Sequence, residues 1–244
     1  MDFGRFSDAL ALAREVADLV GLFKINVHLF TAEGPDAVRK LAKLGVGVFL
    51  DLKFHDIPNT VAGAVTAATA LPGVQLLNVH ATGGLEMMRA AAKALAASKP
   101  AGPGPKLLGV TILTSMDREA LVQVGISGSP RTRVVSLARL AKRSGLDGVV
   151  ASPQEVRQIR RACGRNFLIV VPGVRPAPAE KTAGRRPDDQ ARVATPGEAI
   201  RAGADYLVVG RPIAAASDPR AAARSIVAEM SLAMQEPMRR TRGG

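Results

Sequence analysis

Residues 48–60, with the sequence VFLDLKFHDIPNT, contain the side chains of this chain that are best suited to chemistry. An apolar run leads into Asp51, Lys53 and Asp56, so we expect a buried strand that opens into a loop with two carboxylates and one ammonium. Alternate strand residues share a face, which places Asp51 beside Lys53, while Asp56 could reach over from the loop. A lysine between two acids stays protonated and can serve as a positioned proton donor. An exposed ion-pair cluster at a loop is the alternative interpretation.

Similar residue types recur where other apolar runs end. In barrels of alternating strands and helices, the reactive groups gather at the carboxyl ends of the strands. Charges scattered over a protein surface would not be expected to coincide with the ends of strands. The candidates at or just beyond expected strand ends are Lys24, Asp51, Lys53, Asn78, His80, Thr114, Ser115, Pro172, Arg175, Gly210 and Arg211.

The elements that must position these groups alternate as strand and helix along the chain. Apolar runs predict strands at 22–26, 46–51, 74–80, 106–113, 146–152, 167–176 and 205–213. Helical spacing predicts helices at 7–20, 33–44, 58–71, 85–97, 131–143, 154–162, 196–202 and 219–234. Near-continuous apolar strands are typical of parallel sheets covered on both faces. We therefore expect a single α/β domain over residues 1–236 and a basic, frayed tail at 237–244.

Eight strand and helix pairs would close a (β/α)8 TIM barrel, and the pattern supplies seven strands. The strand that should precede the first helix has only MDFGRF available, which is too short for a buried strand. We expect a barrel whose first strand is truncated at the N-terminus. The natural protein should then carry roughly six or more apolar residues before Asp2, since a parallel sheet depends on burial of both faces.

Composition and charge bear on the class of function. The chain has 244 residues, which suits one barrel, and no apolar run approaches a membrane span. The first residues lack the pattern of a signal peptide, so we expect a cytoplasmic protein. The net charge is +12, but the basic runs are scattered and aromatic residues make up only 3%, so nucleic-acid binding is not expected. The lone Cys163 can form no internal disulfide.

The last expected strands suggest a phosphate site. The sequence VVGRPI places Gly210 at a strand end, where the missing side chain would let an anion approach backbone N–H groups, and Arg211 follows as a charged fork. Barrels often bind phosphate at the loops after their last two strands, so the long loop 175–190 would contribute as well. A solvated arginine is the alternative.

The histidines do not predict a metal site. His55 and His80 lie near strand ends, but no second His or Cys stands at ligand spacing, and His28 falls in a different loop. We expect hydrogen-bonding roles for His55 and His80, and no metal.

Together these motifs resemble a known family. FLDLKFHDIPNT, FKI, NVHATGGLEMM, LTSM, VVPGVRP, DDQARVATP and DYLVVGRPI occur in order and are similar to segments of the bacterial orotidine 5′-phosphate decarboxylases, nearly from end to end of the chain. The resemblance implies decarboxylation of orotidine 5′-phosphate to uridine 5′-phosphate, without cofactor or metal, in a homodimer with active sites at the interface.

The resemblance also implies roles for individual residues. Lys53 would protonate carbon 6 of the pyrimidine, and Asp51 would lie beside the departing carboxylate. Asp56, Ile57 and Thr60 would reach the site of the partner subunit. The remaining substrate contacts would be Asp2 and Lys24 at the ribose, Thr114 and Pro172 at the base, and Arg175, Gln190, Gly210 and Arg211 at the phosphate. The loop between Arg175 and Gln190 is longer than is usual in the family.

Two other functions remain open from the sequence. Sugar-phosphate decarboxylases and aldolases of the same wider group share the Asp, Lys, Asp pattern but use magnesium, and they resemble one another in having an acid where this chain has Lys24. A lysine there would repel the metal. The chain could also be a non-catalytic nucleic-acid or scaffold protein descended from the enzyme, against which the intact Asp51, Lys53 and Asp56 argue.

Overall fold

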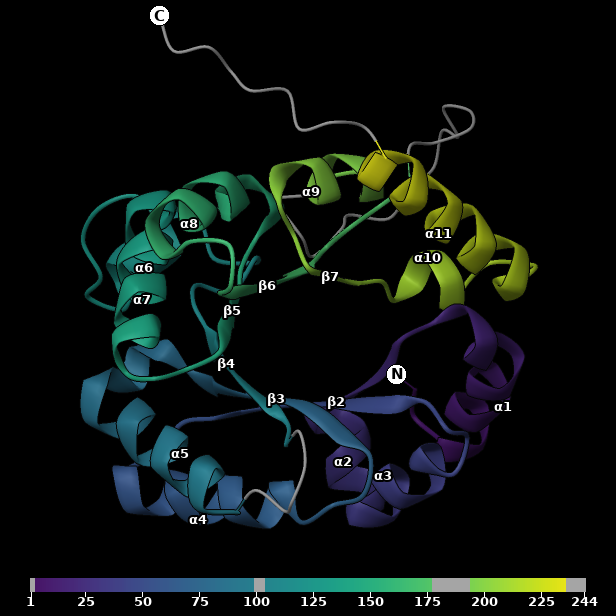
Figure 1. Ribbon diagram of the computed structural model, residues 1–244, viewed down its shortest axis with the longest axis horizontal. Helices are drawn as coiled ribbons and strands as arrows, with labels where there is room; N and C mark the ends of the chain where they lie inside the picture. The colour runs from purple at the N-terminus through teal and green to yellow at the C-terminus, as the bar shows by residue number, and fades with distance from the viewer. Residues whose placement is uncertain (1–2, 99–103, 177–193, 236–244) are drawn as a thin grey trace, which may run out of the picture.

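Seven parallel strands form the centre of the molecule in the computed structural model, which describes residues 3–98, 104–176 and 194–235 (Figure 1). Each strand pairs with the next along the chain, so their order in the sheet is their order in the sequence. The seven expected strands are all present. They are β1 Leu22–Asn26, β2 Gly47–Phe54, β3 Val74–His80, β4 Lys106–Val110, β5 Gly148–Val150, β6 Leu168–Pro172 and β7 Tyr206–Val208.

Helices surround the strands on the outside (Figure 1). One continuous hydrophobic cluster packs between the two layers and includes Phe6 near the start of the described chain and Ala223 near its end. The boundary expected between a domain and a tail at residue 236 lies outside the described residues. The helices are α1 Phe6–Val16, α2 Val27–Glu33, α3 Pro35–Ala42, α4 Pro58–Thr69, α5 Gly84–Ser98, α6 Arg118–Gln123, α7 Pro130–Arg143, α8 Val156–Cys163, α9 Pro196–Ala202, α10 Arg211–Ala214 and α11 Pro219–Gln235.

The fold is a nearly closed barrel of the (β/α)8 type. Within the described residues, β1 pairs with β2 and β7 pairs with β6, but no strand joins β7 to β1. Figure 1 shows that α11 and α1 lie side by side at this opening, and the two helices are in contact. The prediction of seven strands with the first barrel strand missing therefore matches the described chain.

Several expected strand bounds were wrong. The strands predicted over 106–113 and 167–176 stop at Val110 and Pro172, and two further errors concern the site. The strand predicted to stop at Asp51 continues to Phe54, which places Lys53 on β2 and not on a loop. The strand predicted over 205–213 stops at Val208, and Arg211 begins helix α10. The apolar run through Ile213 suggested a strand, yet the proline after Arg211 fits the first turn of a helix, where its missing N–H has no partner to lose.

Local capping explains two short helices that the apolar pattern did not predict. The side chain of Asn26 accepts a hydrogen bond from the Leu29 N–H at the start of α2. The side chain of Asp117 does the same for the Ala120 N–H at the start of α6. Such caps satisfy N–H groups that a first helical turn leaves without partners, and they stabilise helices too short to show a clear apolar period.

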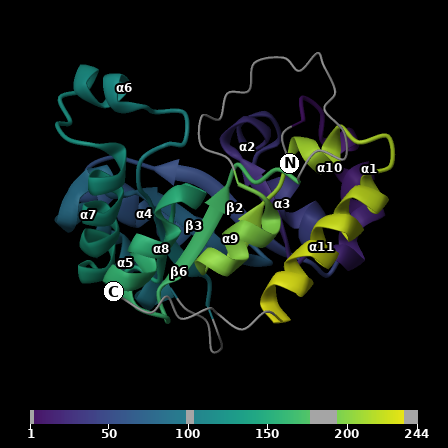
Figure 2. The same ribbon diagram turned by 90° about the horizontal axis from the view of Figure 1, so that it is seen from above.

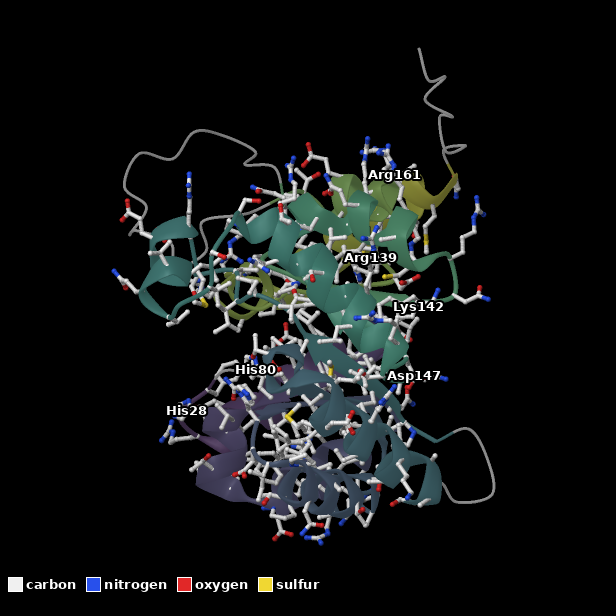
Figure 3. All side chains as sticks on the ribbon, turned by 90° about the vertical axis from the view of Figure 1, so that its left-hand side faces the viewer. His28, His80, Arg139, Lys142, Asp147 and Arg161 are labelled. Carbon is white, nitrogen blue, oxygen red and sulfur yellow. The ribbon has the colours of Figure 1, made fainter. Side chains whose placement is uncertain are left out.

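The two ends of the barrel are chemically different. Figure 2 shows the arrow of β6 pointing toward the side on which α6 lies. In Figure 3, His28 and His80 lie at this carboxyl end, whereas Lys142 and Asp147 lie at the opposite, amino end. Lys106 and Asp147 form an ion pair at the amino end, 2.9 Å between Nζ and Oδ1. None of the helices in the described ranges combines the length and the apolar character that crossing a membrane requires.

Candidate active site

A buried carboxylate between two lysines dominates the carboxyl end of the barrel. Asp51 is only 7% exposed, on β2. Its Oδ2 accepts a hydrogen bond from Lys24 Nζ on β1 at 2.9 Å, and its Oδ1 accepts one from Lys53 Nζ at 2.7 Å. Strand pairing produces this contact, because Asn26 and Asp51 are partners across β1 and β2 and Lys24 lies two residues back on β1.

The order of the charged groups is the reverse of the order expected from their spacing in the sequence. Lys53 was expected between Asp51 and Asp56, but in the described chain Asp51 lies between Lys24 and Lys53. The Asp56 Oδ1 instead accepts a hydrogen bond from the neighbouring Ile57 N–H at 2.6 Å. The short connection from β2 to α4 turns Asp56 outward before the helix begins, so its carboxylate is exposed.

The two lysines determine the protonation of Asp51. Burial by itself raises the pKa of the carboxyl group, since desolvation disfavours the charged form. The charges of Lys24 and Lys53, with hydrogen bonds from Lys53 and Asn78, outweigh burial and lower the pKa from 3.8 to about 2. Asp51 is therefore ionised at neutral pH.

A histidine pair lies beside this cluster. The rings of His55 and His80 are 5.3 Å apart between centroids and tilted by 32°. Burial lowers the pKa of His80, and the charges of His55 and Lys53 lower it further. His80 is thus a neutral ring near neutral pH, and the hydrogen-bonding role expected for it remains a prediction.

A cavity of about 640 Å³ opens next to the lysine and aspartate cluster. Eight of the residues to which the family resemblance gave roles line it, from five of the strands and the segments that follow them, and the further candidate Ser115 lines it as well. The eight are Lys24, Asp51, Lys53, Thr114, Pro172, Arg175, Gly210 and Arg211.

The remaining expected site residues are not in this cavity. Asp56 and Ile57 line a separate surface hollow with His55 and Pro58. Thr60 is exposed on the first turn of α4. Asp2 and Gln190 lie outside the described residues.

The interior of the barrel beneath the polar groups is apolar. Phe49, Leu76, Leu108 and Val170 form a buried cluster of their own, and Phe49, Leu76 and Val170 also line the cavity. An apolar floor lowers the local dielectric, which strengthens the interactions of charged groups above it. The site therefore combines a preorganised charge cluster with a water-poor base.

Two guanidinium groups belong to the opposite side of the cavity. Arg175 follows β6, and Arg211 follows β7 with Gly210 before it. A Cβ atom added at Gly210 would meet no atom of the described residues within 4 Å, so the space next to this backbone is open. Val174 pairs with Ala194 in an isolated parallel bridge, and the Arg175 N–H donates to the Ala194 carbonyl oxygen at 3.0 Å. The chain thus returns to Arg175 after the intervening segment.

Comparison with known proteins identifies the family. The family model described as orotidine 5′-phosphate decarboxylase / HUMPS family matches residues 1–226. The chain belongs to this family. A curated relative from Anaeromyxobacter dehalogenans, named orotidine 5′-phosphate decarboxylase, is 56% identical over 228 residues, covering 93% of this chain and 95% of that protein. A relative of the same name from Geobacter sulfurreducens is 53% identical over 230 residues, covering 94% of this chain and 93% of its own length.

Solved structures of the family have the same fold. The crystal structure of orotidine 5′-phosphate decarboxylase from Lactobacillus acidophilus superimposes with a TM-score of 0.81 at 39% identity, covering 94% of this chain and 96% of that chain. The family resemblance inferred from the motifs is confirmed, and so is the barrel fold.

One site residue received no role from the sequence. Asn78 on β3 is fully buried, and its side chain bonds both to Asp51 and to the backbone of Lys53. A signal was present, because an amide inside the apolar strand VQLLNVH must find hydrogen-bond partners once buried. The apolar pattern could not say which partners these would be.

The described residues also bear on metal binding. No group of three or more His, Cys, Asp or Glu side chains in residues 3–98, 104–176 and 194–235 is arranged to hold a metal ion. The expectation of a metal-free reaction remains a prediction.

We predict that Lys24→Met raises the pKa of Asp51. The folded pKa of about 2 lies below the ordinary 3.8, so Asp51 stabilises the fold above pH 4 or so, and this contribution is lost as the pH falls toward about 2. Without the Lys24 charge the loss should begin at higher pH. Carboxyl NMR titration of Asp51, together with the free energy of unfolding against pH, would measure both effects. Lys106→Met, at the other end of the barrel, should leave the Asp51 titration unchanged, and an unchanged titration in Lys24→Met as well would contradict the assignment.

Proposed function

We propose that this protein decarboxylates orotidine 5′-phosphate to uridine 5′-phosphate and carbon dioxide, a step of pyrimidine nucleotide synthesis. The observation that carries the proposal is the Lys24, Asp51 and Lys53 cluster at the edge of a cavity whose far side has two arginines. Family membership and the names of the relatives support the same reaction.

The chemistry requires a stabilised carbanion. The bond between carbon 6 and the carboxylate breaks, carbon dioxide leaves, and the electron pair remains on carbon 6. The pyrimidine ring offers no electron sink at this position, so a fixed cation must lie beside it. In the proposed mechanism Lys53 stabilises the developing negative charge and then donates its proton to carbon 6. Water returns a proton to the lysine, so that one proton is consumed per turnover.

Asp51 has two parts in this proposal. Its negative charge, 2.7 Å from Lys53 Nζ, holds the ammonium group in place at the cavity. Because the carboxylate is ionised at neutral pH, it would also lie next to the substrate carboxylate with like charge. Lys24 would balance this charge and donate to a ribose hydroxyl, while Thr114 and Pro172 would line the pocket of the base.

The phosphate would bind on the other side of the cavity. Arg175 and Arg211 line the cavity there, and the backbone at Gly210, which has no side chain, leaves room for an anion. Binding energy from a phosphate remote from carbon 6 would hold the substrate against Lys53 and could be used in the transition state. Asp2 and Gln190, outside the described residues, would complete the ribose and phosphate contacts.

A homodimer is part of the proposal. Asp56, Ile57 and Thr60 are exposed, and Ile57 has 67% of its surface accessible. Their position outside their own cavity supports a role in the neighbouring subunit, where Asp56 would approach the Lys53 of its partner.

A magnesium-dependent sugar-phosphate reaction is the second candidate, because the matching family model also covers the HUMPS proteins. The position of Lys24 argues against it. Its ammonium group is 2.9 Å from Asp51 Oδ2, where it neutralises the carboxylate that a metal would need and repels a cation. A non-catalytic scaffold is disfavoured by the intact charge cluster in a cavity.

Replacing the proposed proton donor should abolish turnover. We predict that Lys53→Ala lowers kcat for orotidine 5′-phosphate by several orders of magnitude, while the dissociation constant of uridine 5′-phosphate changes far less, because the ammonium acts mainly in the transition state. Loss of substrate absorbance measures the rate. Lys106→Ala serves as the matched control with parental activity, and a Lys53→Ala rate within about tenfold of the parent would remove Lys53 from this role.

Removal of divalent metals distinguishes the two enzyme candidates. We predict that parental activity toward orotidine 5′-phosphate survives exhaustive chelation, because the Lys24 ammonium occupies the position beside Asp51. If activity fell and magnesium restored it, the sugar-phosphate chemistry would become the better account.

The phosphate contacts can be tested by comparing two ligands. We predict that Arg211→Ala weakens binding of uridine 5′-phosphate by roughly 2–4 kcal/mol, the range for truncating one partner of a buried charged pair, and leaves uridine binding nearly unchanged. Titration calorimetry with both ligands gives the difference. Arg161→Ala, an exposed arginine at the amino end, should change neither, whereas equal losses for both ligands in Arg211→Ala would place Arg211 elsewhere.

Mixing two inactive variants tests the shared site. A heterodimer of Lys53→Ala and Asp56→Ala chains has one site with both defects and one site with none. After verified subunit exchange at equal concentrations, we expect about a quarter of the parental activity, since about half of the dimers are mixed and each has one working site. Failure to recover activity would mean that each site is built within one chain.

A further inference from the structure

We propose that Asn78 is a positioning residue for decarboxylation, whose single amide group holds both the Asp51 carboxylate and the backbone of Lys53 in place. The Asn78 Nδ2 donates to Asp51 Oδ1 at 2.7 Å, and the Asn78 Oδ1 accepts from the Lys53 N–H at 2.7 Å. The inference rests on the proposed function, in which Lys53 is the proton donor.

The backbone at Lys53 requires such a support. Lys53 has φ of 52°, the one positive φ at a residue other than glycine in the described ranges. A side chain makes this left-handed conformation costly, so neighbouring contacts must hold it, and residues held in this way cluster at functional sites. Lys53 is thus in an unfavourable conformation at the position where the chemistry is proposed.

The pairing of β2 with β3 shows how the conformation arises. Leu50 pairs with Leu77 and Phe54 with Val79, so β2 advances four residues while β3 advances two. Residues 51–53 therefore arch away from the regular ladder, as in a bulge, and the ladder no longer supplies a partner for the Lys53 N–H. The side chain of Asn78, which lies between the two β3 partners, supplies it.

An amide is the functional group that fits both contacts. Asn78 must accept from an N–H on one side and donate to a carboxylate on the other, and a neutral side-chain amide does both without adding charge. An apolar side chain such as leucine would leave the Lys53 N–H without this acceptor. A carboxylate would place a second negative charge against Asp51.

The charged and titratable groups around the Asn78 amide come from neighbouring strands. Asp51, Lys24 and Lys53 face the amide from β1 and β2, and His80 lies two residues further along β3. On the other side Asn78 pairs with the apolar Leu108 of β4. The Asp51 carboxylate thus receives three hydrogen bonds, of which the one from Asn78 comes from a neutral donor.

The decisive variant is Asn78→Asp, which keeps the shape and the acceptor for Lys53 but exchanges the amide donor for a carboxyl oxygen beside Asp51. Two carboxyl groups at this distance share a proton, and only the protonated form can donate to Asp51 as the amide does. We expect kcat to fall about 100-fold at neutral pH, the size of loss that a small misplacement of reacting groups produces. The ratio of variant to parental kcat should then rise as the pH is lowered.

The companion variant is Asn78→Ala, which loses both hydrogen bonds and has no group to protonate. Its kcat should be low at every pH. The dissociation constant of uridine 5′-phosphate should stay close to the parental value in both variants, because the phosphate contacts lie on the other side of the cavity. Asn166→Asp, an exposed asparagine before β6, makes the same chemical change and should leave kcat and its pH profile parental.

Several outcomes would overturn the inference. Parental kcat in both Asn78 variants across the pH range would do so. A loss of activity in Asn78→Asp that is equal at every pH and follows the fall in Tm would show a purely structural role. If the parent itself does not decarboxylate orotidine 5′-phosphate, the proposed function fails, and the positioning role is then decided by NMR. In that case an Asp51 titration and a Lys53 amide shift unchanged in Asn78→Ala would overturn it.

Discussion

The pairing of one buried carboxylate with two ammonium groups is the interaction on which the rest of the site depends. Removing Asp51 from water disfavours its charge, and the lysines on either side more than offset that cost, as the lowered pKa of Asp51 records. The same contacts hold both lysines in fixed positions. The cluster therefore stabilises the fold and also fixes the electrostatic field in the cavity. Replacing either lysine would alter the surroundings of Asp51 and of the other lysine.

The barrel is what makes this cluster possible. Parallel strands end at the same side, so side chains from β1, β2 and β3 meet there although they are far apart in the sequence. Inside the barrel, Phe49, Leu76 and Val170 give the cavity an apolar base. The polar groups above thus interact in a medium of low dielectric, where their orientation has the largest effect.

Much of this arrangement could be predicted from the sequence, for physical reasons that also explain the errors. Strands buried on both faces must be apolar, so β1 to β7 were recognisable, and the grouping of Lys24, Asp51 and Lys53 followed from their place at strand ends. The orientation of Asp56 depended on a short turn into α4 that spacing alone could not reveal.

Other features depended on long-range contacts. The last strand was expected to continue past Val208, because apolar residues recur as far as Ile213, and a proline in a first helical turn looks the same in sequence as one that ends a strand. Asn78 was recognised only as a polar residue at a strand end. Its role depends on the mismatch between β2 and β3, in which residues 25 to 27 positions apart are brought together.

The bridge between Val174 and Ala194 affects how many residues the chain can carry between these two positions. Because the chain leaves and returns at adjacent points, the intervening segment is a closed excursion whose ends are fixed by the barrel. As a general rule, doubling the number of residues that connect two fixed ends costs only about 0.6 kcal/mol of closure entropy. Insertions and deletions between these two positions can therefore accumulate in evolution with little effect on folding, while Arg175 stays anchored beside the cavity. The stretch between these two positions is then also the natural place to graft a new recognition element onto this barrel.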